Sequence, residues 1–160
     1  MIFVTVGTHE QPFDRLLREV DKLIEKKVIT EKVIMQTGFS KYTPKNAEWK
    51  SFLSYDQMDQ MIVSSHIVIS HGGPASFLNV MSQGKTPIVV PRLSEFHEHV
   101  NDHQLIFVQQ LIDRGYDIKL VNPIDNLGDT IKQYDKHAES YKSHNSQFMD
   151  SFENVVHDLF

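Results

Sequence analysis

The sequence predicts an α/β domain in which a Rossmann-like parallel sheet carries helices on both faces. Short runs rich in β-branched residues alternate with longer stretches whose apolar residues recur at helical spacing. The clearest unit is the segment 67–92, which reads IVISHGGPASFLNVMSQGKTPIVVPR. It consists of a strand, a glycine turn, a helix and a second strand, which together form a right-handed crossover between parallel strands. With 160 residues, the chain has the size of a single domain covering 1–160.

The predicted strands are apolar runs bounded by glycine, proline or polar residues. They cover 2–6, 32–37, 49–53, 67–70, 88–90 and 118–121. The first of them leads into a helix that Pro12 opens, because proline suits the start of a helix. The apolar stripe of that helix is formed by Phe13, Leu16, Leu17, Val20, Leu23 and Ile24.

The remaining helices have recognisable start and stop signals. Ser54 or Asp56 caps the second helix, and Pro74 opens the third, which Gly84 ends. A fourth helix covers 101–114, and Gly115 ends it. A short helix at 127–134 follows, and the apolar stripe of the tail predicts an amphipathic C-terminal helix over about 146–160.

Composition excludes several classes of function. The net charge of −5 argues against nucleic acid as a partner. The absence of cysteine excludes disulfides, thiolate catalysis and cysteine-based zinc sites, and fits a reducing compartment. The first ten residues lack the pattern of a signal peptide, and no uncharged stretch is long enough to span a bilayer. We therefore expect a cytoplasmic protein.

Three loops should meet at the carboxyl edge of the predicted sheet, where open α/β sheets bind ligands. They are 7–11, 70–76 and 91–104. Gly7 and Thr8 offer N–H groups and a hydroxyl, and the helix that starts at Pro74 offers further N–H groups, all suited to phosphate. The fingerprints G-x-G-x-x-G and G-x-x-x-x-G-K are absent, which disfavours an NAD enzyme or an ATPase.

The third loop contains HEHVNDHQ, which allows a metal site or a hydrogen-bonding site. Zinc needs three or four ligands in tetrahedral geometry, and the candidates are His97, Glu98, His99 and His103. The spacing is not H-E-x-x-H, and histidine also hydrogen-bonds sugars and phosphates. We therefore predict hydrogen bonding, with no metal and no cofactor.

Three stretches together resemble the nucleotide-sugar-binding C-terminal half of glycosyltransferase family 28. They are VTVGTHEQPFDRL, SHGGPASFLNVMSQGKTPIVVPR and NDHQLIFVQQL, and the likeness covers roughly residues 1–121. The chain is most similar to the stand-alone proteins of that type. These include the catalytic subunit of the two-subunit enzyme that adds the second GlcNAc in N-glycan assembly, and bacterial capsule and exopolysaccharide proteins with a membrane-associated partner.

This resemblance implies the C-terminal half of a GT-B fold and an inverting transfer from a UDP-sugar without a metal. The other half, which holds the lipid-linked saccharide acceptor, would be a separate partner subunit that recruits this chain to the inner face of the membrane. By position, Gly7, Thr8 and His9 would face the diphosphate. A general base must also reach the acceptor hydroxyl, and His9 is the candidate for it on this chain, unless the partner supplies the base. The implied donor-binding residues are Gly7, Thr8, His71, Gly72, Gly73, Ser76, Asn79, Asn101, Asp102, His103 and Gln104.

One position departs from the family pattern. Members commonly carry a glutamate that accepts hydrogen bonds from both ribose hydroxyls, and this chain has Asn79 there. An uncharged amide with one acceptor oxygen is expected to hold ribose less firmly. This departure keeps a non-catalytic accessory subunit open as an alternative, with a flavodoxin-like nucleotide sensor ranked last. Galactose, GlcNAc and glucuronic acid remain open as the sugar, with galactose favoured by the resemblance.

Overall fold

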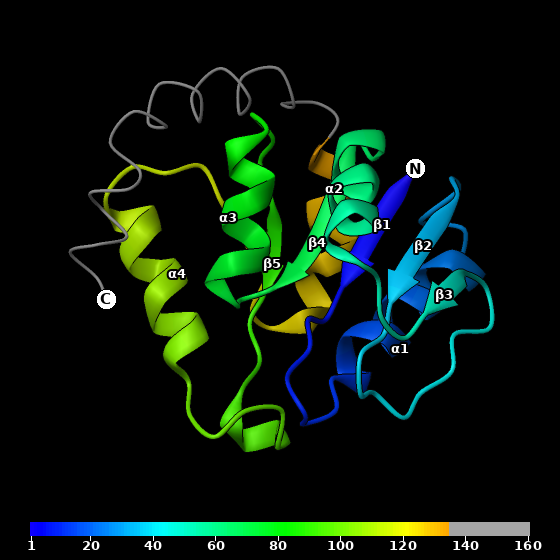
Figure 1. The fold of residues 1–160 in the computed structure, drawn as a ribbon, viewed down its shortest axis with the longest axis horizontal. Coiled ribbons are helices and arrows are strands. Elements are labelled where there is room, and N and C mark those ends of the chain that lie inside the picture. The colour runs from blue at the N-terminus through cyan, green and yellow to red at the C-terminus, as the bar shows by residue number, and fades with distance from the viewer. Residues whose placement is uncertain (135–160) are drawn as a thin grey trace.

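The computed structural model describes residues 1–134, which form one six-stranded sheet with helices on both faces (Figure 1). All strand pairs are parallel, in the order β3-β2-β1-β4-β5-β6. The strands are β1 (Ile2–Thr5), β2 (Val33–Gln36), β3 (Glu48–Lys50), β4 (Ile67–His71), β5 (Ile88–Val90) and β6 (Lys119–Leu120). The predicted α/β class with a parallel sheet is confirmed.

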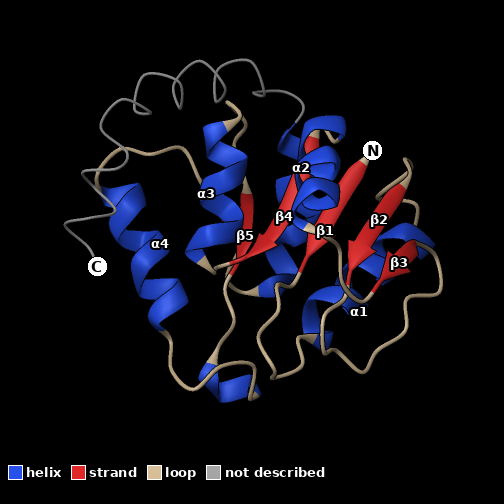
Figure 2. Cartoon of the chain, viewed as in Figure 1, coloured by secondary structure: helices blue, strands red, loops and turns tan. Residues whose placement is uncertain are grey.

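Two layers of helices cover the sheet (Figure 2). The main helices are α1 (Asp14–Glu25), α2 (Tyr55–Ser64), α3 (Pro74–Ser82), α4 (His103–Asp113) and a last helix over 127–134. Two short 3₁₀ turns are η1 (Ser94–Phe96) and η2 (Ile124–Asn126). The α1 helix and the 127–134 helix share one apolar core with β1, β2, β4 and β5. The α2, α3 and α4 helices pack on the other face through two smaller cores.

Several predicted start and stop signals are confirmed. Ser54 caps α2 in a reciprocal capping box with Gln57, and Pro74 is the first residue of α3. Gly84 ends α3 with a φ of +76°. The predicted amphipathic helix at 146–160 lies outside the described residues.

Other boundaries differ from the prediction. The α1 helix begins at Asp14 with Phe13 as its N-cap, so Pro12 precedes the helix and does not open it; the N–H of Phe13 donates to Ser40 Oγ. The third strand is Glu48–Lys50 and not 49–53. It is an edge strand, and the carbonyl of Ser51 beyond it accepts hydrogen bonds from Gly38 N and Gln36 Nε2. The last part of the predicted strand is therefore a turn, which these hydrogen bonds attach to the end of β2.

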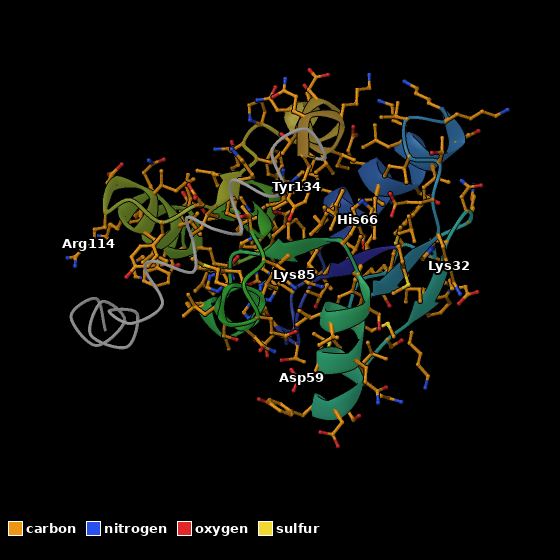
Figure 3. All side chains as sticks on the ribbon, turned by 90° about the horizontal axis from the view of Figure 1, so that it is seen from above. Lys32, Asp59, His66, Lys85, Arg114 and Tyr134 are labelled. Atoms are coloured by element: carbon orange, nitrogen blue, oxygen red, sulfur yellow. The ribbon has the colours of Figure 1, made fainter. Side chains whose placement is uncertain are left out.

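The strand order reverses between β1 and β4, and open α/β sheets bind ligands outside the carboxyl ends of their strands at such a reversal. The loop after β5 reaches the same edge before it enters α4. Lys85 lies at the opposite edge, and Figure 3 labels it on the turn after α3. Its ammonium donates to carbonyl oxygens at the end of α2, including that of Val63 at 2.9 Å. The carboxyl edge is therefore where a ligand is expected.

Candidate functional site

The imidazole of His71 lies between two glycines at the carboxyl edge. It ends β4, and its side chain is only 7% exposed. A Cβ on Gly7 would lie 2.4 Å from His71 Nε2, and a Cβ on Gly73 would lie 2.1 Å from His71 Cε1. Gly7 also has a φ of +78°, which disfavours any other residue. The glycines are thus required because the ring fills the space where side chains would stand.

The hydrogen bonds of His71 fix its tautomer. The N–H of Gly73 donates to Nδ1 at 3.0 Å, so Nδ1 carries no proton. The proton is on Nε2, which donates to Ser76 Oγ at 3.0 Å. Burial lowers the pKa of His71 to about 3, and the positive charges of Arg92, His9 and His99 act in the same direction. His71 is therefore a neutral hydrogen-bond donor at physiological pH.

This buried neutral histidine predicts a loss of stability in acid. The folded-state pKa of about 3 lies below the unfolded value of 6.5, so unfolding takes up a proton between these values. The stabilisation is complete above pH 6.5 and is lost as the pH falls below it. Between pH 7 and pH 5 the wild type should lose about 2 kcal/mol more unfolding free energy than His71→Asn. Urea unfolding of both proteins at each pH measures this difference, and parallel pH dependences would contradict it.

Gln36, which the sequence analysis did not single out, supports the backbone of Gly7 through hydrogen bonds. Its Oε1 accepts from Thr5 Oγ1 at 2.6 Å and from Gly7 N at 3.1 Å. Its Nε2 donates to the carbonyls of Gly7 at 3.0 Å and Ser51 at 2.8 Å. The side chain is buried, at 2% exposure, so all four contacts are shielded from water. Gln36 thereby ties the loop after β1 to the turn after β3.

Gln104 performs the matching task on the other side of the site. It lies in the first turn of α4, and its Oε1 accepts from Gly72 N at 3.0 Å and Arg92 N at 2.9 Å. The oxygen of this predicted sugar-contacting amide is therefore engaged by two backbone N–H groups. Its Nε2 lies 3.5 Å from His71 Nδ1.

The amides of the two glycine turns are thus already satisfied within the protein. Gly7 N donates to Gln36 and Thr5, Gly72 N to Gln104, and Gly73 N to His71. At the α3 start the N–H groups of Ser76 and Phe77 donate to Gly73 O, so the N–H of the first turn that can turn to an anion is that of Ala75, together with the positive end of the helix dipole. Pro74 has no N–H, so the N–H of Ala75 is the first that α3 offers.

Two hollows flank the start of α3, and both are bordered by Pro74. The one beside β1 has a volume of about 410 Å³ and the one beside α4 about 330 Å³. Predicted residues at the first are Gly7, Thr8, His9, His71, Gly73 and Ser76. Predicted residues at the second are Gly72, Asn101, His103 and Gln104. The three predicted loops therefore do converge.

Asn79 and Asp102 border neither hollow. Asn79 Nδ2 donates to Asp59 Oδ1 at 2.8 Å and so links α3 to α2. Asp102 precedes α4 and accepts from both the N–H and the hydroxyl of Ser94, which lowers its pKa. These contacts give both side chains a role in joining elements of the fold.

His9 lies beside His99 at the rim of the first hollow. Their rings stack with centroids 4.6 Å apart. Gln11 Nε2 donates to the carbonyl of His97, so Gln11 Oε1 is the atom that accepts from His9 Nε2, at 2.8 Å. The proton on Nε2 leaves Nδ1 of a neutral His9 as the nitrogen with a lone pair, and Nδ1 is the atom that could accept a proton.

The histidines of the third loop do not gather in one place. His99 and His103 border the hollow beside α4, whereas His97 borders a separate cavity against α1. His97 also adopts a left-handed conformation, with a φ of +58°, which turns the chain between them. Among residues 1–134, no three histidine, aspartate or glutamate side chains come close enough to hold a metal ion.

Comparison with known families agrees with this geometry. The model of the glycosyltransferase family 28 C-terminal domain matches residues 1–159. The chain belongs to this family. Comparison with curated proteins gives no significant match. Family membership identifies the chain as a glycosyltransferase domain of the donor-binding, Rossmann-like half of a GT-B enzyme. Within the described part of this family 28 domain, none of the helices has the length and apolar character needed to cross a bilayer.

Proposed function

We propose that this family 28 domain is the donor-binding, catalytic subunit of an inverting glycosyltransferase. It would take a hexose, for which we favour galactose, from a UDP-sugar and transfer it to a lipid-linked saccharide in capsule or exopolysaccharide synthesis. A membrane-associated partner subunit would supply the acceptor-binding half. The observation that carries this proposal is the convergence of two hollows on the start of α3, at the point where the strand order reverses.

The chemistry of the hollows suits a nucleoside diphosphate sugar. Leu53 and Met58 give the larger hollow an apolar wall against which a pyrimidine can pack. Thr8 and Ser76 add hydroxyls near the α3 start, where a diphosphate is favoured. His103 and Asn101 border the second hollow, which lies across Pro74 and is large enough for a hexose.

The arrangement also suits inverting transfer. The acceptor hydroxyl attacks the anomeric carbon, the bond from that carbon to the β-phosphate oxygen breaks, and UDP takes up the negative charge. The α3 start and the Ser76 hydroxyl favour that charge, because Ser76 accepts from His71 and keeps its own proton to donate. Nδ1 of His9 would accept the proton of the attacking hydroxyl, or a base on the partner would do so.

The Ser76 hydroxyl should contribute measurably to UDP binding. Ser76→Ala removes one hydrogen bond to a charged group, which corresponds to about 1–2 kcal/mol or roughly 5- to 30-fold in affinity. Ser82→Ala is the matched control, because that serine lies at the other end of α3 and donates to Asn79 O. Titration calorimetry with UDP measures both, and an equal effect of the two changes would contradict the role.

Turnover by the reconstituted pair tests the proposed function itself. The affinity of the wild-type chain for UDP is measured first. Radiolabelled UDP-sugars are then screened as donors on membranes that contain the partner. Thr8→Ala, His71→Ala and Gln104→Ala should each reduce turnover while the complex still assembles. If the wild-type chain binds no UDP with or without the partner, the proposed function is wrong.

Asn79 favours a second candidate, a non-catalytic subunit that stabilises a partner transferase. Its amide is held by Asp59 and borders neither hollow, so it is not placed to grip a ribose. This candidate predicts unchanged turnover in the three variants above, provided that the complex forms. Loss of turnover in an assembled complex rules it out.

A further inference from the structure

Arg92 is a fully buried cation directly behind the candidate site. Its side chain is 0% exposed and stands among the largest fully buried side chains of the described residues. Nη2 donates to Val6 O at 2.6 Å, and Nη1 donates to Gln11 O at 2.6 Å and Glu98 O at 3.0 Å. The guanidinium lies 5.0 Å from the centre of the Phe13 ring. Within the described part of the chain, its Nε has no hydrogen-bond partner.

No carboxylate in residues 1–134 forms an ion pair with this guanidinium. The nearest acidic residue to consider is Glu98, whose carboxylate is already engaged by Arg15 through two contacts of 2.9 Å and by Leu93 N at 3.1 Å. Glu98 hydrogen-bonds Arg92 only through its backbone carbonyl, although the nearby charge of its carboxylate raises the pKa of Arg92 and offsets part of the effect of burial. Burial lowers the pKa of Arg92 to about 10, which still leaves it charged at neutral pH. Burying a charge without a paired carboxylate lowers the stability of the folded state, so a functional role for this charge is expected.

The contacts of Arg92 coincide with the ends of the loop after β1. Val6 O precedes Gly7, and Gln11 O follows Glu10, so one guanidinium fixes both ends of 7–11. The backbone N–H of Arg92 donates to Gln104 Oε1, the same atom that receives Gly72 N. Arg92 therefore joins the two glycine turns from the protein side. Its charge acts on both His71 and His99, since it opposes protonation of each.

We infer that Arg92 is a positioning residue that sets the 7–11 loop and contributes positive charge to an anionic ligand held between that loop and the α3 start. This inference rests on the proposed function and extends it. No lysine or arginine of residues 1–134 borders either hollow, so the attraction to a diphosphate comes from a charge shielded from solvent and from salt. A charge role acts on the diphosphate of UDP and leaves the nucleoside unaffected, whereas a merely structural role affects both.

The test compares UDP with uridine, by calorimetry for UDP and NMR shift titration for uridine, on the folded chain. Arg92→Met should weaken UDP binding by roughly 10- to 100-fold and uridine binding by less than about 3-fold. Arg92→Lys should retain most of the preference for UDP. Arg114→Met, which removes an exposed cation after α4, is the matched control and should change neither affinity.

A second variant keeps Arg92 in place. Glu98→Gln removes the negative charge that offsets the buried cation, and should strengthen UDP binding several-fold while uridine binding stays unchanged. Because Glu98 also pairs with Arg15, this variant supports the inference but does not decide it alone. If Arg92→Met does not fold, Arg92→Gln, which keeps a hydrogen-bonding end without the charge, decides the question. If the variants change the affinities for UDP and uridine by the same factor, the role of Arg92 is overturned and the proposed function is unaffected. A wild type that binds UDP no more tightly than uridine overturns both.

Discussion

Gly7→Ala is expected to abolish detectable UDP binding and to lower the stability of the domain by more than about 3 kcal/mol. An L-residue at a φ of +78° costs about 1–2 kcal/mol before any contact is considered. The new Cβ would then stand 2.4 Å from His71 Nε2. The ring cannot move aside without breaking hydrogen bonds, because both of its nitrogens are engaged, Nδ1 with Gly73 N and Nε2 with Ser76 Oγ. Thermal unfolding and UDP titration measure the two effects.

Gly84→Ala is the control that distinguishes backbone strain at a positive φ from the steric clash with His71. Gly84 has nearly the same φ, +76°, but lies at the far end of α3. It should therefore show the cost of the left-handed conformation without displacement of His71. If Gly7→Ala destabilises the protein no more than Gly84→Ala and still binds UDP, the ring of His71 does not depend on Gly7.

Gln36→Leu should have the second-largest effect, about 3 kcal/mol or more in unfolding free energy. The substitution keeps the volume but removes four hydrogen bonds. Ser51 O still accepts from Gly38 N, and Gly7 N still donates to Thr5 Oγ1, but the Thr5 hydroxyl proton and the Gly7 carbonyl lose the amide of Gln36, and each buried group left unsatisfied costs about 1–3 kcal/mol unless water reaches it. UDP affinity should fall by at least 10-fold, because the loop that carries Thr8 loses its support. Urea unfolding and calorimetry measure both.

Two variants control this prediction. Gln133→Leu changes an exposed glutamine on the 127–134 helix and should alter stability by less than about 0.5 kcal/mol. Gln36→Glu keeps an acceptor oxygen but replaces the Nε2 donor by a second carboxylate oxygen, which places a negative charge beside the first hollow, so it should weaken UDP binding by repulsion in addition to destabilising the fold. Wild-type binding by Gln36→Leu would show that the loop does not need this amide.

The crossover 67–90 could be predicted from the sequence because each of its signals is local. Uncharged β-branched runs mark β4 and β5, Pro74 marks the first turn of α3, and Gly84 marks its end. The convergence of three loops followed from topology, since the carboxyl ends of parallel strands share one edge. The candidate residues at both hollows were therefore predictable as a group.

The support behind these residues could not be predicted, because it depends on contacts between distant segments. Gln36 reaches Gly7 across 29 positions, and Arg92 reaches Val6 across 86. A signal did exist in each case: a polar residue closes the apolar run VIMQ, and a cation follows the apolar run IVVP. Without coordinates, neither could be distinguished from an ordinary residue at the end of a strand.

Exposed elements were the least predictable. All three residues of β3 are exposed, so no alternation of apolar and polar residues defines its limits. Asn79 faces Asp59 on α2, a pairing that helical spacing alone does not reveal. Which donors are left for a ligand depends on such partners, and the engaged amides of Gly7, Gly72 and Gly73 illustrate this.

The internal satisfaction of those three amides has a consequence for the kinetics of recognition. Because the turns already hold their shape through Gln36, Gln104 and His71, an incoming nucleotide meets a pre-organised surface and need not order the backbone. Encounter should then proceed without a slow rearrangement step, and the lifetime of the bound state should govern differences in affinity between ligands. Replacement of the product UDP by a new donor molecule should likewise require no refolding of these loops.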